Sequence, residues 1–211
     1  MTEILSLTED QRDCLQEIVN VAMGQAGDSL ARFLEVFVHL SVPRIRLVGS
    51  SELPEALTQL VGGAESICAV RQGFYSISSG KGMRGEALVI FGDKSFKELA
   101  ELLAYEDDLN EHTEKELLLD VTNVLTSACL NRIGEQIETE LAYSSPSILG
   151  FRMPPQEAVS PEKLIWSQAL LVEIHYTLEK GSFSCNLMLL MPEEVIEILK
   201  KALDHLLESF E

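Results

Sequence analysis

Two segments of the sequence each carry a carboxylate and an asparagine three residues apart, followed at a fixed distance by a proline. The two sets are 103 positions apart and consist of Glu17, Asn20 and Pro43 in the first half and Asp120, Asn123 and Pro146 in the second. Residues three apart on a helix share a face, so each acid projects beside its amide. An asparagine side chain is neither base nor nucleophile at neutral pH, but it donates and accepts hydrogen bonds at once. Such an amide can hold a water molecule in a defined position.

Each pair has a small residue on the same helical stripe. Gly24 continues the first stripe one turn beyond Asn20, and Ser127 holds the equivalent place in the second. Glycine inside a helix costs about 0.5–1 kcal/mol relative to alanine. We therefore expect another backbone to approach closely at Gly24, and we expect both stripes to have a shape that admits a partner.

The repeat extends beyond the acid and amide pairs, which indicates an internal duplication. An isolated acid and amide at this spacing is most often a solvated helix face. Here the same displacement of 103 also relates Val21 to Val124, Leu30 to Ile133, Leu34 to Ile137, Ser41 to Ser144 and Ile45 to Ile148. Repeated core residues are expected of any duplicated fold, whereas a repeated acid and amide are harder to explain by packing alone.

The elements that would position these residues follow the same order in both halves. A capping box at Thr8–Gln11 opens a long helix over 8–38, followed by strands near 41–48, 66–77 and 85–91 and a short helix over 95–103. In the second half, Thr113–Glu116 caps a long helix, followed by strands near 146–151, 165–178 and 182–191 and a helix from Pro192. Residues 187–190 echo 88–91 at a displacement of 99, so loop lengths must differ by four residues.

This order predicts an α+β fold of two duplicated half-units, each a helix, three strands and a helix. Half-units of this size are too small to be independent, so we expect one pseudo-twofold domain over 1–211, with repeats at about 8–104 and 113–209. The two halves would share one β-sheet that supports the two long helices.

Charge and composition exclude several classes of function. A formal net charge of −18 argues against nucleic acid and anionic membranes as partners, because these are bound largely through Lys and Arg. The first residues carry no basic segment or long apolar run, so we expect a cytoplasmic protein. The four cysteines and four histidines are scattered, which predicts no metal site. The glycine pattern over 80–85 precedes a strand and not a helix, so it indicates a hairpin, with 180–181 as its counterpart, and not a dinucleotide site.

Residues 17–26, EIVNVAMGQA, and 41–45, SVPRI, resemble the first motif of the CheC/CheX/FliY family of chemotaxis phosphatases. The spacing from asparagine to proline, which occurs twice, also resembles that family's signature. The resemblance covers essentially the whole chain, whose length makes it most similar to the CheC branch.

The resemblance implies hydrolysis of the aspartyl-phosphate on a CheY-type response regulator. Asn20 and Asn123 would position the attacking water, as glutamine does in GTPases, and Glu17 and Asp120 would dock a lysine of the regulator. The resemblance implies no cofactor of the protein's own, since Mg²⁺ would arrive on the regulator. Asp120 departs from the family's glutamate and is one methylene shorter. A misplacement of about 1 Å can cost on the order of a hundredfold in rate, so Glu17 and Asn20 form the more secure site.

A second class of function remains open. The protein could be a binding protein that sequesters a phosphorylated regulator or a CheD-like deamidase without hydrolysis. A relative in the flagellar switch shares the family's fold without its acid and amide pairs, so the presence of both pairs favours the enzyme. A CheD-like partner and a homodimer through exposed strand edges stay open as well.

Overall fold

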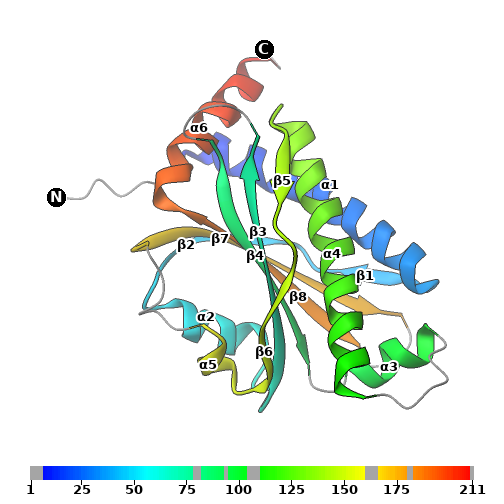
Figure 1. Ribbon diagram of the computed structural model, residues 1–211. Helices are drawn as coiled ribbons and strands as arrows, with labels where there is room; N and C mark the ends of the chain where they lie inside the picture. The colour runs from blue at the N-terminus through cyan, green and yellow to red at the C-terminus, as the bar shows by residue number, and fades with distance from the viewer. Residues whose placement is uncertain are drawn as a thin grey trace.

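The computed structural model describes residues 7–77, 82–92, 95–103, 110–159, 166–179 and 183–209. These residues form an α+β fold of one curled antiparallel sheet with helices on both faces (Figure 1). The elements of the first half are α1 Glu9–Leu34, β1 Val38–Leu40, β2 Arg44–Gly49, α2 Leu53–Leu60, β3 Ile67–Ser76, β4 Arg84–Gly92 and α3 Ser95–Leu102. Those of the second half are α4 Glu111–Gln136, β5 Leu141–Tyr143, β6 Ser147–Met153, α5 Pro155–Ala158, β7 Gln168–Leu178, β8 Ser184–Pro192 and α6 Glu193–Glu208.

The two halves share one sheet, and its outer strands cross over between them. Its eight strands include the path β1-β7-β8-β4-β3-β5, with β2 also paired to β7 and β6 also paired to β3. The halves therefore meet at β4 and β8, where Leu88 lies opposite Met188. Each half supplies the long strand on which the other half's first two strands are paired.

Apolar residues fill the space on both faces of the sheet. One cluster lies between the sheet and α1, α3, α4 and α6, and a second lies under α2 and α5. Along β4, Val89 and Phe91 belong to the first cluster, whereas Leu88 and Ile90 belong to the second. This alternation is the two-residue period of a strand, so the central strands of the sheet are buried on both sides.

The alternation of buried faces corrects the sequence displacement that relates the strands of the two halves. Phe74 of β3 and Tyr176 of β7 face the long helices, as do Val89 of β4 and Leu189 of β8. A displacement by an odd number would place equivalent residues on opposite faces. The expected displacement of 99 is therefore wrong. The ladders give the even values, because the pair Ala69 and Ile90 matches the pair Leu171 and Leu190, at displacements of 102 for β3 and β7 and 100 for β4 and β8.

The predicted half-unit of helix, three strands and helix is also wrong. The described residues of each half form four strands, because β1 and β5 precede the predicted first strands, and they also form a further helix, α2 or α5. Pro43 divides β1 from β2, since it has no N–H for the ladder. Pro54 and Pro155 lie in the first turns of α2 and α5, where a missing N–H costs least. The same order of elements occurs in both halves, and the duplication itself stays a prediction.

The ends of the long helices agree with one prediction and correct another. Thr8 caps α1 in a capping box with Gln11, as expected. The helix α4 begins earlier than Thr113, because Asn110 accepts hydrogen bonds from the N–H groups of residues 112 and 113. Asparagine is among the best N-cap residues. Both helices end before left-handed residues at φ 53°, Glu35 and Glu138, so α1 stops short of residue 38.

The glycine pattern lies at a hairpin partly outside the described residues. Gly80, Lys81, Lys180 and Gly181 belong to that excluded part. Gly85 lies within β4, and no helix follows it directly. The context required for a dinucleotide site is therefore missing from the described residues around this pattern.

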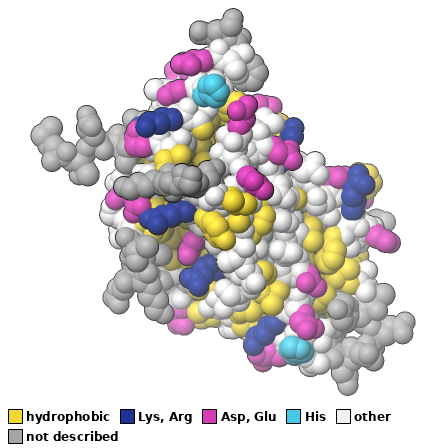
Figure 2. Space-filling view, turned by 45° about the horizontal axis from the view of Figure 1, so that its top comes forward, with side chains coloured by type: hydrophobic (Ala, Val, Ile, Leu, Met, Phe, Trp, Pro, Cys, Tyr) yellow, Lys and Arg dark blue, Asp and Glu magenta, His cyan; other side chains and the backbone are white. Residues whose placement is uncertain are grey.

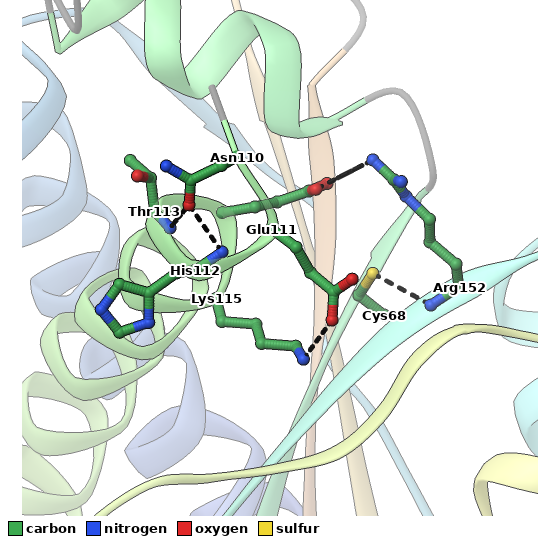
Figure 3. Close-up of polar contacts among 8 residues, drawn as sticks. Cys68, Asn110, Glu111, His112, Thr113, Lys115 and Arg152 are labelled. Atoms are coloured by element: carbon green, nitrogen blue, oxygen red, sulfur yellow. Dashed lines mark hydrogen bonds and ion pairs between the residues drawn. The ribbon is translucent and has the colours of Figure 1, made fainter. Parts of the chain in front are cut away.

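An ion pair anchors the N-terminal end of α4 to β6 (Figure 3). The buried carboxylate of Glu114 accepts two hydrogen bonds from Nη2 of Arg152, at 2.8 and 3.1 Å. The backbone N–H of Arg152 also donates to Sγ of Cys68 on β3, at 3.4 Å. Arg152 adopts φ 48°, a conformation that L-residues avoid. The helix that carries Asp120 and Asn123 is thus fastened at its first turns to two strands.

We predict that Arg152→Ala lowers the free energy of unfolding by about 1–3 kcal/mol, because a buried carboxylate loses a cation. The value lies below that of a fully buried pair, since the Arg152 side chain is 55% exposed and screened by water. Arg152→Gly is the matched control, because it loses the same ion pair but tolerates the positive φ. Urea denaturation should find Arg152→Gly the more stable variant by roughly 1 kcal/mol. Wild-type stability in Arg152→Ala would contradict the anchoring role.

Candidate functional site

The first acid and amide pair lies on α1 beside the connection between β1 and β2. Nε2 of Gln16 donates to the carbonyl oxygen of the buried Pro43, at 3.0 Å. Three turns further on, a Cβ added to Gly27 would lie 2.9 Å from the side chain of Leu40. Asn20 lies between these two contacts on the same helical stripe. It is half-buried, whereas Glu17 is exposed.

A serine pins the connection beside each long helix to a strand of the other half. The N–H of Ser41 donates to the carbonyl of His175 at 3.0 Å, and the N–H of His175 donates back to Oγ of Ser41 at 3.2 Å. Ser144 makes the same two bonds with Gly73, both at 2.9 Å. The predicted match of Ser41 with Ser144 thus has a structural counterpart, and the two partners, Gly73 and His175, are 102 positions apart.

The second pair lies on α4, where a glutamine of β3 contacts the amide. Asp120 and Asn123 are both exposed. Nε2 of the buried Gln72 donates to Oδ1 of Asn123 at 3.3 Å and to the carbonyl of Ser144 at 3.0 Å. Oγ1 of Thr126 donates to Oε1 of Gln72. The prolines differ as well, since Pro146 is only half-buried.

Gly24 and Ser127, the small residues beside the two asparagines, have different surroundings from those expected. A Cβ at Gly24 would meet no atom within 4 Å, so no backbone of this chain approaches closely there, and an approach by a partner stays a prediction. The surface beside Asn20 is open at this point. Ser127 bonds to the carbonyl of Asn123 within its own helix. It also lines a cavity of about 540 Å³ between α1 and α4, whose other lining residues include Gln25, Ser29, Asn131 and Arg132.

The structure places each pair on its own long helix, beside a different connection. Asn20 lies beside the β1–β2 connection and Asn123 beside β5 and β6, and β1 and β5 are the two ends of the path of strands. The molecule therefore has two separate candidate sites. Each opens on the surface beside a long helix and is backed by the sheet.

The two candidate sites differ in the polarity of their rims. The segment that follows α1, which includes the connection beside the first site, carries exposed apolar side chains, with 77% of Val42, 75% of Phe37 and 37% of Leu40 exposed. At the displacement of 103, the second site has Ser145, Glu140 and Tyr143 in these places. Figure 2 shows apolar side chains that reach the surface between acidic and basic ones on one face of the molecule. The connection beside the first site is thus more apolar than its counterpart, although Leu149 of β6 and Tyr75 of β3, which pairs with β5, are exposed near the second.

Two buried cysteines are unsuited to act as nucleophiles, and the described residues offer no metal-binding cluster. Burial raises the pKa of the Cys129 thiol to about 12, and it raises the pKa of Cys185 further, so both thiols are protonated at neutral pH. Within the described ranges, no group of three or more His, Cys, Asp or Glu side chains could hold a metal ion. None of the helices described there is long and apolar enough to cross a membrane. The chemistry available at each site is that of a carboxylate and an amide.

Sequence reasoning missed Gln16, Gln72 and Thr126. Gln72 carried a signal, because it is a polar residue between Val70 and Phe74 on one face of a strand. Its contact with Asn123 joins residues 51 positions apart, and no local pattern reveals such a contact. Gln16 directly precedes the predicted acid, and nothing in its spacing distinguishes it from a solvated residue.

No protein-family model matches the chain, and no curated protein matches it significantly. Several solved structures do match it. FliY of Thermotoga maritima is 18% identical with a TM-score of 0.67, covering 94% of this chain and 98% of that one. The middle domain of FliM from H. pylori is 11% identical with a TM-score of 0.58, covering 93% and 99%.

A chain of the CheX–CheY–BeF3–Mg²⁺ complex from Borrelia burgdorferi is 12% identical with a TM-score of 0.50, covering 82% of this chain and 97% of that one. This chain has the CheC/CheX/FliY fold. FliM shares that fold, so the fold alone assigns no reaction. The residues of the two candidate sites must carry the functional argument.

The open surface at Gly24 leads to a prediction about stability. Gly24→Ala should raise the free energy of unfolding by roughly 0.5–1 kcal/mol, because alanine favours a helix and its Cβ meets no neighbour. Gly134→Ala on α4 is the matched control. Its Cβ would lie 2.5 Å from the carbonyl oxygen of Thr139, so we expect a loss of about 1–3 kcal/mol. Denaturant titration of both variants makes the comparison, and a destabilised Gly24→Ala protein would contradict the open surface.

Proposed function

We propose that this chain is a member of the CheC/CheX/FliY family and hydrolyses the aspartyl-phosphate of a CheY-type response regulator. The observation that carries the proposal is the presence of two accessible acid and amide pairs, each on a long helix beside a pinned connection. The fold supports the proposal, because one structure with this fold was solved in a complex with CheY, BeF3 and Mg²⁺.

In the proposed reaction, the amide of Asn20 or Asn123 holds a water molecule in line with the phosphorus. The water oxygen forms the new bond to phosphorus, and the bond from phosphorus to the regulator's aspartate oxygen breaks. The aspartate leaves as a carboxylate, and the water protons pass to the released phosphate and to solvent. An amide cannot take a proton at neutral pH, so it acts by positioning.

The carboxylates would dock the regulator. Glu17 and Asp120 are exposed, so either can pair with a lysine of an incoming protein. Mg²⁺ bound by the regulator would stabilise the charge on the phosphoryl oxygens. The positive charge for this reaction therefore comes with the substrate, as the acidic balance of the chain requires.

The decisive experiment incubates the protein with a panel of phosphorylated single-domain regulators and follows release of phosphate. We predict that the Asn20→Ala/Asn123→Ala double variant turns over the best substrate on the order of 10²-fold more slowly, because positioning of the water is lost. Binding of the regulator should change little. Equal turnover by the wild-type and double-variant proteins would exclude the amide mechanism and leave a binding protein that does not hydrolyse its partner.

A further prediction concerns the shorter acid of the second site. In an Asn20→Ala background, where the second site alone works, Asp120→Glu should lower KM, because the longer side chain reaches further toward the docked lysine. Asp120→Asn is the control and should raise KM, since it removes the charge. Steady-state kinetics on the three proteins decide the matter. A higher KM in Asp120→Glu would mean that the aspartate is matched to its own partner.

A further inference from the structure

We propose that Gln72 is a positioning residue that sets the orientation of the Asn123 amide. The inference rests on the proposed function, because it assigns a role in the reaction at the second site. This role would make the second site better organised than the first for holding water. The length of the carboxylate alone ranks the sites the other way, because Glu17 is longer than Asp120.

The bonds of Gln72 determine which end of its amide faces Asn123. Its side chain is 2% exposed and lies on the face of β3 that packs against the long helices. Buried amides must satisfy both their acceptor and their donors. The carbonyl oxygen of Ser144 can only accept, so the NH2 group of Gln72 is the end that faces it. Oε1 then accepts from the hydroxyl of Thr126, and the carbonyl of Thr122 at 2.7 Å is the alternative acceptor for that single proton. The oxygen of Gln72 therefore faces Thr126, and its NH2 group is directed at Asn123 and Ser144.

This arrangement orients the exposed Asn123. An NH2 group can only donate, so it selects the orientation in which Oδ1 of Asn123 faces it. The NH2 group of Asn123 then points away from β3, and a second lone pair on Oδ1 remains for water. The separation of 3.3 Å is long for an N–H···O bond. The contact therefore guides the amide more than it immobilises it.

Apolar residues replace this network in the first site. Thr126 corresponds to Met23 at the displacement of 103, and Gln72 corresponds to Ile174 at the strand displacement of 102. Met23 and Ile174 are both buried in the apolar cluster under the long helices. Among the described residues, no side chain or backbone group makes a hydrogen bond with the amide of Asn20. Its orientation is thus left to water or to the partner.

Each site therefore has one feature that the other lacks. The first has the longer carboxylate and the second has the oriented amide. An amide whose orientation is set before the substrate arrives loses less freedom in the transition state. The expected signature is an effect of Gln72 on kcat through Asn123, without an effect on KM.

The kinetic test uses Gln72→Met, which keeps the length of the side chain and removes both donors. In an Asn20→Ala background, we expect kcat to fall about 10-fold with KM unchanged. In an Asn123→Ala background, the same substitution should leave the remaining activity unchanged. Thr126→Val is a second variant with the same expected pattern, since it removes the hydroxyl that orients Gln72. Equal losses in both backgrounds would show a general structural effect and would overturn the inference.

A measurement without substrate separates this inference from the proposed function. The side-chain NH2 resonances of Asn123, assigned by their loss in Asn123→Ala, should shift in Gln72→Met and in Thr126→Val. The side-chain resonances of Asn20 should stay in place in both variants. If the wild-type protein hydrolyses no regulator while the Asn123 resonances shift, the proposed function fails and the orienting contact stands. Resonances of Asn123 that do not move would overturn the inference whatever the activity.

Discussion

The pairing of β4 with β8 and the crossing of the outer strands constrain the whole molecule. Because β7 carries β1 and β2 while β3 carries β5 and β6, neither half of the chain completes a sheet by itself. The connection beside each long helix is pinned by a serine to a strand of the opposite half. The shape of both candidate sites therefore depends on the integrity of the full sheet and not only on the helices that carry the acid and amide pairs.

A common scaffold supports two chemically different sites. The backbone contacts of Ser41 and Ser144 are the same in both halves, so the connections beside the amides are fixed in the same way. The differences lie in side chains: one methylene in the acid, and a Gln72 that faces a helix where the other half has Ile174. In the proposed reaction, small changes of this kind would alter docking and positioning separately, because the carboxylate and the amide would act on different parts of a partner.

The sequence predicted those features that depend on local pattern. The two long helices, the capping box at Thr8 and the shared sheet follow from helical periodicity and alternation. Strands β1 and β5 were missed because they are three residues long, too short to show an alternating pattern. A proline can follow one strand or precede the next, so Pro43 did not reveal that a strand ends before it. The displacement of 99 failed because residues 88–91 and 187–190 are apolar on both faces, so they carry no alternation that would set their register. The open surface at Gly24 and the contact of Asn123 with Gln72 depend on tertiary packing, so no local sequence pattern predicts them.

The crossed strands also impose an order on the growing polypeptide. Gln72, Asn123 and Ser144, which make the contacts of the second site, have all been synthesised once residue 144 is made. The connection that flanks Asn20 waits for His175, because Ser41 is held by that strand alone among its described contacts. Contacts of such wide sequence separation form late. During synthesis, the direct contacts of the second site can therefore form before those of the first, and β1 and β2 have no strand to pair with until β7 is made.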